Sequence, residues 1–374
     1  MLRWPRVGSP VRESMESWIP LDTRKEQILK AVVADYTATG VPVGSHALAL
    51  HLASWSAATI RNELATLVEV GYLLQPHTSA GRVPSDRGYR YYVDFLMEEE
   101  GLPGGVRRQL EPRLAVMPAH IEGVLELAAQ VLAVAVDALS IVTGPQARSV
   151  TVKHLDLVSL DPAHALLILV LDGNLIRQHP MSLSREADQE ELSRLAGRLN
   201  EEIVGLDGAQ IEAGGGGDPG HPLRSEVLAD IAAFLRSVES RQDTLIVHDG
   251  VRNLLHQPEF GDVQRLAQVL ELVEEERVLG ELLAASFEGV GSGPQPGQPG
   301  APPGGRPVTV VIGTESGISQ LSGCSLVLTT YRAGEGRGGT VGVLGPTRMP
   351  YSQVAPRVRF VADRVGEAVG RVLS

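Results

Sequence analysis

Residues 56–74 read SAATIRNELATLVEVGYLL, and this stretch predicts a helix followed at once by a strand. Ser56 is suited to cap the helix, because its hydroxyl can accept a hydrogen bond from a free backbone amide. Gly71 stands where a left-handed residue commonly ends a helix, and the apolar residues 72–74 are typical of a strand. The inner face of the helix is a row of apolar residues at helical spacing, made of Ile60, Leu64, Leu67 and Val68.

Two helices are predicted before this one. Thr23 and Glu26 have the spacing of a capping box, and we expect them to open a helix that ends at Gly40. Pro42 prevents the helix from continuing. Ser45 is expected to cap a short second helix that runs to residue 52.

A strand hairpin and a further helix are predicted after it. Residues 77–82 (HTSAGR) form a polar turn, and Ser85 is expected to cap the next helix. That helix packs through Tyr89, Tyr92, Val93 and Leu96. Three helices followed by a hairpin indicate a winged helix-turn-helix, which we assign to residues 21–100. In this fold the third helix enters the major groove of DNA, and the hairpin reaches phosphates or the minor groove.

Helical spacing predicts which residues of the third helix face DNA. At about 100° per residue, Ala58 and Asn62 lie opposite the apolar row, with Thr59 and Arg61 on the flanks. Arginine pairs well with guanine and asparagine with adenine, while small side chains allow close approach. The hairpin and the next helix add residues of the types that contact phosphates. The predicted DNA-contacting residues are Ser45, Ser56, Ala58, Thr59, Arg61, Asn62, His77, Thr78, Ser79, Arg82, Arg87 and Arg90.

The charges restrict DNA binding to this end of the chain. The 374 residues include 33 basic and 45 acidic ones, a formal net charge of −12, which excludes a uniformly basic nucleic-acid coat. Residues 1–97 hold 10 basic and 9 acidic side chains, so the acidity lies in the later part. The single Cys324 excludes an internal disulfide and a cysteine-rich zinc site. We expect a cytoplasmic protein that needs no cofactor or metal and spans no membrane.

The later part of the chain favours an α+β fold over a doubly wound sheet, because hairpin-like strands alternate with helices. We expect residues 1–20 to be a disordered extension and the Gly/Pro-rich residues 289–307 to be a flexible loop. Residues 334–339 have the GxGxxG spacing of dinucleotide sites. The residues after them have the pattern of a strand rather than a helix, so we interpret them as a hairpin loop.

Several motifs resemble one family. At the N-terminal end they are residues 43–45 (VGS), 56–62 (SAATIRN) and 71–73 (GYL), followed by the most distinctive block, 75–84 (QPHTSAGRVP) with 88–94 (GYRYYVD). At the far end they are residues 324–326 (CSL), 330–332 (TYR) and 345–349 (GPTRM). With these motifs the chain resembles the HrcA family of heat-inducible transcription repressors. His46 and Trp55 depart from residues common in the family at these positions.

The resemblance implies a domain organisation and a function. It implies a winged-helix DNA-binding domain at 21–100 and a GAF-like α/β domain made of residues 105–184 and 256–374. A dimerisation domain, residues 185–255, would be inserted into the GAF-like one. It further implies a homodimer that represses heat-shock chaperone operons by binding a double-stranded inverted-repeat operator called CIRCE. The GroE chaperonin would modulate this activity.

Two other functions compete with this reading. In the first, the chain is a ligand-sensing GAF-type regulator whose winged helix serves only as a scaffold. In the second, it is a protein-interaction hub that mainly binds chaperonin. The sequence offers no convergent set of catalytic residues, so we do not expect an enzyme.

Overall fold

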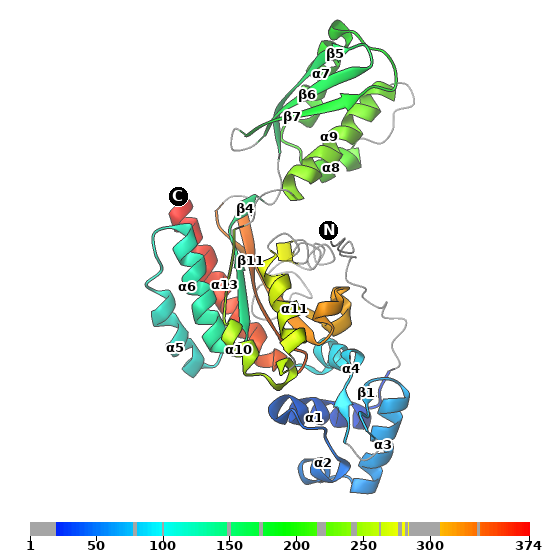
Figure 1. Ribbon diagram of the computed structural model, residues 1–374, viewed down its shortest axis with the longest axis vertical. Coiled ribbons are helices and arrows are strands. Elements are labelled where there is room, and N and C mark those ends of the chain that lie inside the picture. The colour runs from blue at the N-terminus through cyan, green and yellow to red at the C-terminus, as the bar shows by residue number, and fades with distance from the viewer. Residues whose placement is uncertain are drawn as a thin grey trace. The chain divides into compact units, whose positions relative to one another are not determined.

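The structure is a computed structural model of the chain (Figure 1). It describes residues 20–77, 81–98, 101–147, 151–171, 175–214, 222–240, 245–261, 263–275, 279–280, 283, 307–334 and 337–374. The chain divides into two compact units. The second unit consists of residues 146–243 and 335–337, and the first contains the chain on either side of it. The expected extension at residues 1–20 and the loop at 289–307 lie almost wholly outside the described residues.

Residues 20–98, part of the first unit, are called the N-terminal module here. In chain order its elements are α1 (Thr23–Thr39), α2 (Ser45–His51), α3 (Ala57–Glu69), β1 (Leu73–Leu74), β2 (Val83–Pro84), α4 (Asp86–Tyr91) and the π-helix η2 (Tyr92–Leu96). Strands β1 and β2 pair antiparallel. The predicted order of three helices, a strand pair and a further helix is therefore confirmed.

Local capping sets most of these helix ends as predicted. Ser56 accepts a hydrogen bond from the Thr59 amide at 3.1 Å, and Ser85 accepts one from the Gly88 amide at 3.0 Å. Gly40 ends α1 with a φ of 66°, a left-handed conformation that glycine adopts at no steric cost.

The predicted capping box at the start of α1 is wrong. Asp22, rather than Thr23, caps the helix by accepting from the Lys25 amide at 2.9 Å. Glu26 instead accepts a hydrogen bond from the Tyr91 hydroxyl at 3.0 Å, which ties α1 to the end of α4. Asp22 has the extended backbone of an N-cap residue, with φ −74° and ψ 160°, so Thr23 is already the first residue of the helix.

The remainder of the first unit, together with the short strand β4 at the start of the second unit, is called the sheet domain. Its antiparallel strands lie in the order β8-β3-β11-β10-β9, with β4 pairing β11 off this path. The strands are β3 (Leu139–Thr143), β4 (Gln146–Ala147), β8 (Ile246–Asp249), β9 (Thr309–Ile312), β10 (Cys324–Arg332) and β11 (Arg337–Pro346). Strand β11 begins at Arg337, within the GxGxxG-like residues 334–339, and continues beyond them, so the strand predicted after this motif is confirmed.

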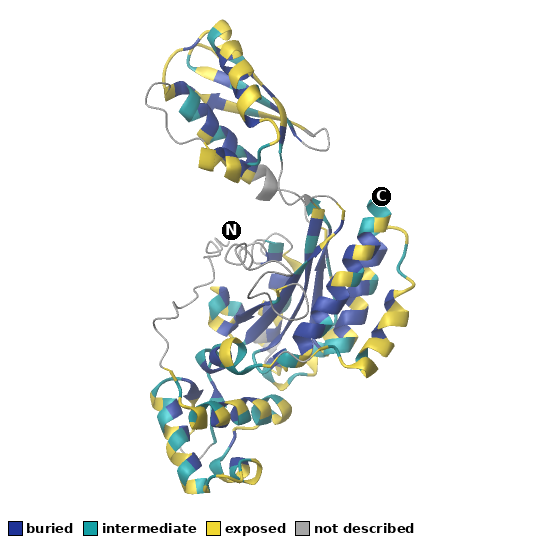
Figure 2. Ribbon diagram, turned by 180° about the vertical axis from the view of Figure 1, so that it is seen from behind, coloured by how far each residue is buried: buried dark blue, intermediate teal, exposed yellow. Residues whose placement is uncertain are grey.

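Helices cover both faces of this sheet (Figure 2). Val327, Val341 and Val343 share one apolar cluster with α6 (Ile121–Val136) and α13 (Tyr351–Leu373), next to α5 (Gly104–Leu114). Alternate residues such as Leu326 and Leu328 face a second cluster. That cluster is built on α10 (Val251–Leu255), η4 (Pro258–Phe260), α11 (Val263–Glu274) and η6 (Ser319–Leu321), and η5 (Gly313–Ser316) follows β9 beside it. The core of the N-terminal module is continuous with the first cluster.

The second unit is a three-stranded antiparallel sheet covered by helices on one face. Its elements are β5 (Val152–Asp161), β6 (His164–Leu171), β7 (Leu175–Ser182), α7 (Gln189–Ile203), α8 (Gly208–Gly214) and α9 (Pro222–Ser240). The unit begins at residue 146 and ends at 243, whereas the sequence boundaries place the insertion at 185–255. The difference arises because β5–β7 bury Leu167 and Leu169 against α7 and α9 instead of joining the sheet of the first unit.

The helices were also compared with the length and hydropathy that a membrane span requires. No helix in the described part of the chain is both long enough and apolar enough to cross a membrane.

Replacement of Gly88 by alanine tests the packing inside the N-terminal module. A Cβ at this position would lie 2.0 Å from the carbonyl oxygen of Tyr72, so α4 would have to move away from β1. We expect Gly88→Ala to lower the free energy of unfolding by about 1–3 kcal/mol, measured by urea denaturation. The matched control is Gly197→Ala in α7, where nothing lies within 4 Å of the new Cβ, and a neutral or stabilising effect of up to about 1 kcal/mol is expected. Equal losses in both variants would contradict the packing argument.

Candidate nucleic-acid interface

Helix α3 presents an exposed face of small and hydrogen-bonding side chains. Ala58, Arg61 and Asn62 are exposed and Thr59 is half-buried, while Ile60 and Leu64 are buried on the opposite side. In the part of the chain that the structure describes, the Arg61 guanidinium and the Asn62 amide form no hydrogen bond with another side chain. Both groups are therefore available to a ligand that approaches this face.

The N-terminus of α3 is closed by a polar pair. The Ser56 hydroxyl lies 3.0 Å from the Thr59 hydroxyl in addition to accepting the Thr59 amide. These two predicted site residues thus lie side by side. Their hydroxyls and the remaining amides of the first turn are groups that hydrogen-bond phosphate oxygens.

Two basic residues that the sequence reasoning missed lie beside α3. Glu63 of α3 pairs with Arg24 and with Lys25 of α1, each at 3.2 Å, and the Arg24 guanidinium lies 5.9 Å from the centre of the Trp55 ring. Hydrogen bonds to Asp22 and then to Glu63 raise the pKa of Lys25, which holds it protonated. The available signal was the position of two cations in the first turn of α1, where the helix dipole favours anions.

A backbone bridge joins the predicted hairpin to the segment before α2. Val43 and Arg82 exchange two hydrogen bonds, each of 2.8 Å, which brings Arg82 next to the start of α2. Gly81 is required there, because a Cβ would lie 2.5 Å from the Pro42 carbonyl oxygen. Ser45, predicted as the cap of α2, is instead its first helical residue, and the N-cap position is taken by Gly44 without a side-chain bond. An extended backbone at Gly44 lets the helix start one residue earlier than the serine cap would allow.

The other residues of the hairpin and α4 that were predicted to contact DNA do not all lie on one exposed surface. His77 is exposed at the end of the segment after β1, whereas Thr78 and Ser79 lie outside the described residues. Arg87 turns inward: its Nη1 donates to the Val70 carbonyl at 3.4 Å, and its guanidinium lies 5.2 Å from the centre of the Tyr72 ring. Arg87 therefore packs on the base of the strand pair instead of joining the exposed face of α3.

Arg90 is directed away from α3 and into the sheet domain. Its Nε and Nη2 donate to the two carboxylate oxygens of Glu315 at 2.8 and 2.5 Å. Nη2 also reaches the Val310 carbonyl at 2.5 Å, and Nη1 reaches Asp94 at 3.2 Å. Burial opposes the charge on Arg90, but the bidentate bond to Glu315 outweighs it and raises the pKa of the guanidinium. The structure thus does not bring Arg90 together with Arg61 and Asn62.

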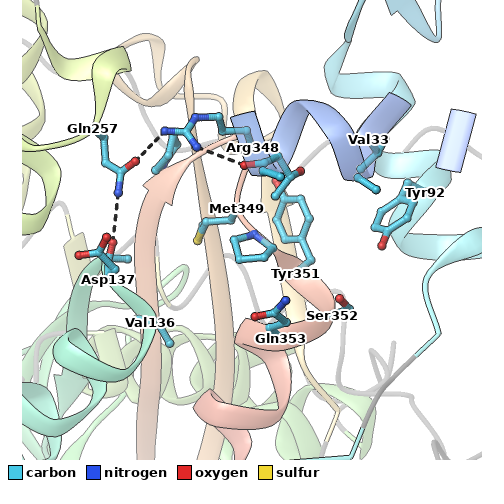
Figure 3. A pocket seen from close by; sticks show the side chains of 16 residues that line it. Val33, Tyr92, Val136, Asp137, Gln257, Arg348, Met349, Tyr351, Ser352 and Gln353 are labelled. Carbon is cyan, nitrogen blue, oxygen red and sulfur yellow. Dashed lines mark hydrogen bonds between the residues drawn. The ribbon is translucent and has the colours of Figure 1, made fainter. Parts of the chain in front are cut away.

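A second arginine joins the N-terminal module to the sheet domain beside a groove of about 520 Å³ (Figure 3). Arg348 donates to the Thr37 carbonyl of α1 at 3.3 Å and to the Gln257 side chain at 2.8 Å, and it forms an ion pair with Glu259. Gln257 in turn donates to the Asp137 carbonyl at 3.4 Å. A chain of hydrogen bonds therefore runs from the end of α6 to the end of α1.

The described residues hold no group of three His, Cys, Asp or Glu side chains arranged to bind a metal ion. Cys324 is buried in the second apolar cluster of the sheet domain.

The comparisons with known proteins agree with one another. The family model described as "HrcA protein C terminal domain" matches residues 122–355. A heat-inducible transcription repressor HrcA of Herpetosiphon aurantiacus is 35% identical over 94% of this chain and 96% of its own length. The HrcA of Thermomicrobium roseum is 36% identical over 95% and 97%.

A solved structure supports the fold. The crystal structure of a hypothetical protein shares 22% sequence identity and covers 94% of this chain and 100% of its own, with a TM-score of 0.53. The family model spans more than half of this chain, and the curated relatives match it nearly end to end. The chain therefore belongs to the HrcA family of heat-inducible transcription repressors, a family of regulators and not of enzymes.

Proposed function

We propose that this protein represses heat-shock chaperone operons by binding the CIRCE inverted repeat as a homodimer. In this proposal the N-terminal module is a winged helix-turn-helix and α3 is the recognition helix. The single observation that carries it is the exposed face of α3, where Arg61 and Asn62 are solvent-accessible on a helix with a capped N-terminus.

The residue types on α3 suit base recognition in the major groove. Arg61 would pair with guanine and Asn62 with adenine, and Thr59 would bond a phosphate or contact a thymine methyl. Ala57 and Ala58 allow the helix to approach the base edges closely. These contacts would supply specificity, since each bidentate pair discriminates between bases by about 1–3 kcal/mol.

Phosphate contacts would come from both sides of α3. Arg82 and Ser45 are brought near each other by the backbone bridge, and the segment that contains His77, Thr78 and Ser79 would reach the neighbouring backbone. Arg24 and Lys25 also lie beside α3, but their ion pairs with Glu63 and Asp22 leave that cluster without net charge, so the positive charge here would come from Arg61 and Arg82. A local basic surface of this kind attracts DNA although the whole chain is acidic.

We assign homodimerisation to the second unit and the GAF-like fold to the sheet domain. On β6, Leu167 and Leu169 are buried under the helices, while Leu166, Ile168 and Val170 alternate with them and are half-buried on the other face. The neighbouring strands continue this outer apolar face with Val158 and Ile176. A sheet face of this composition is suited to cover the same face of a second copy.

The GroE chaperonin enters the proposal as a modulator, by analogy with the family resemblance. A repressor that needs chaperonin to stay active would release its operator when unfolded proteins occupy the chaperonin. This mechanism requires the cytoplasm, where the chaperonin and the DNA meet.

Fluorescence anisotropy tests operator binding directly. The full chain is titrated into a duplex with the CIRCE repeat and into a scrambled duplex, at several salt concentrations, with and without GroE. We expect a preference of about 10³-fold or more for CIRCE. Arg61→Ala should weaken CIRCE binding by about 1–3 kcal/mol and relax the base preference. Arg82→Ala should weaken both complexes and reduce the salt slope by about 1.

The matched control is Arg113→Ala, which removes an exposed arginine of α5 in the sheet domain and should change neither affinity nor slope. Equal binding of both duplexes by folded protein, with chaperonin present, would refute the proposed function. An unchanged CIRCE affinity of Arg61→Ala would refute the assigned face of α3.

Replacement of Ile168 by lysine tests the assigned dimer face. The residue lies on the central strand opposite Asp156, so a lysine can pair with this carboxylate in the monomer, whereas dimerisation through this face would have to bury the added charge. We expect Ile168→Lys to shift the protein from dimer to monomer in sedimentation velocity. The control is Val116→Lys, at a valine 73% exposed in the sheet domain, which should leave the dimer intact. A dimeric Ile168→Lys protein would show that the interface lies elsewhere.

A further inference from the structure

Helix α4 carries an aspartate and an arginine, one helical turn apart, that both bind η5, the turn that follows strand β9. The Asp86 carboxylate accepts hydrogen bonds from the Thr314 amide at 3.0 Å and from the Thr314 hydroxyl at 2.9 Å. One turn later, Arg90 forms the bidentate bond with Glu315. The side chains of Arg90 and Glu315 are only 12% and 21% exposed.

The backbone and side chains of η5 accommodate Asp86 and Arg90 closely. Gly313 has a φ of 51°, and a Cβ on it would lie 2.3 Å from the Asp86 carboxylate, so no other residue leaves room for this contact. Glu315 is also held from behind, because it accepts the Ile312 amide at 2.8 Å. The contact is therefore defined in orientation as well as in distance.

Arg348 forms a second contact of the same kind at a different place. It binds the last turn of α1 through the Thr37 carbonyl. From the side of the sheet domain its guanidinium is held by Glu259 and by Gln257, the second of which is seen in Figure 3. The N-terminal module is thus held to the sheet domain by two separated polar contacts, one on α4 and one on α1. Together they restrict rotation of the module on the sheet domain, which a single contact would permit.

We propose that Asp86, Arg90, Glu315 and Arg348 are positioning residues that make the repressor selective for the distance between its operator half-sites. The inference rests on the proposed function. It assigns these side chains to the junction of the N-terminal module and the sheet domain, and it assigns them no contact with DNA.

The physical reason is the difference between a fixed and a tethered recognition helix. A module held in one orientation reaches a second half-site only when the spacer places it on the same side of the duplex, one turn or a multiple of it away. A module on a flexible tether reaches half-sites at many spacings, at a lower effective concentration for each. Loss of the junction should therefore change the dependence on spacing while the contacts to each half-site remain.

The DNA test uses variants that leave no buried charge unpaired. These are Arg90→Gln/Glu315→Gln and Arg348→Gln/Glu259→Gln, singly and combined, in the full chain. The duplexes carry one half-site, the native operator, or an operator with about half a turn of DNA added to the spacer. In the wild type the longer spacer should cost about 100-fold or more in affinity, whereas in the combined variant it should cost less than about 5-fold. Half-site affinity should stay within about 2-fold.

A distance measurement tests the junction without DNA. Nitroxide labels are placed on Ala65→Cys in α3 and Glu126→Cys in α6, both exposed positions, while native Cys324 is buried. Electron–electron double resonance should give a narrow distance distribution for the wild type and a broad one for the combined variant. The control, Glu111→Gln/Arg364→Gln, removes an exposed ion pair of the sheet domain and should keep both the spacing preference and the narrow distribution.

Each adverse outcome has its own meaning. A folded combined variant that keeps the wild-type spacing preference overturns the inference, and so does an unchanged distance distribution. A loss of half-site affinity in Arg90→Gln/Glu315→Gln would make Arg90 a DNA contact and would also overturn it. A wild type that does not distinguish CIRCE from scrambled DNA refutes the proposed function. The width of the distance distribution then still decides whether these residues fix the module.

Discussion

The arrangement of helices in the N-terminal module depends on how the backbone carbonyls of Gly71 and Tyr72 are bound. Ser85 binds both of them, through its hydroxyl to Gly71 at 2.7 Å and through its amide to Tyr72 at 3.1 Å. The left-handed Gly71, with φ of 83°, ends α3 and starts β1, and Gly88 lets α4 lie against the same carbonyl. One short segment thus satisfies buried polar groups, turns the chain, and fixes α3 relative to α4. Since α4 also contacts the sheet domain, the orientation of the proposed recognition helix is set there.

The features that the sequence predicted correctly depend on neighbouring residues. The cap at Ser56, the end of α1 at Gly40 and the apolar face through Ile60 and Leu64 involve groups within one or two helical turns, where spacing alone determines geometry. The ion pair that Arg90 forms could not be predicted from neighbouring residues. Its partner Glu315 is 225 positions away, and an exposed cation on a helix has the same local pattern whether it meets DNA or a carboxylate.

The domain boundaries show the same limit. Strands β5–β7 alternate buried and exposed residues, which is the pattern of any antiparallel sheet with one covered face, so the pattern does not reveal which sheet they join. Arg348 illustrates the opposite case. Residues 345–349 were recognisable as a family motif, but the role of the arginine as a contact to the end of α1 required the folded arrangement of Thr37, Gln257 and Glu259.

The second unit is inserted where it disturbs the first unit least. Strands β3 and β8, which flank the insertion, are direct neighbours in the sheet, with Thr143 opposite Ile246 and the Gly144 amide bonded to the Leu245 carbonyl at 2.7 Å. The chain therefore leaves and returns at one hairpin end. The entropy of closing that hairpin grows only with the logarithm of the inserted length, about 0.6 kcal/mol per doubling. A change in the length of the insertion would therefore cost the first unit little, because the β3–β8 ladder closes the gap between its two ends.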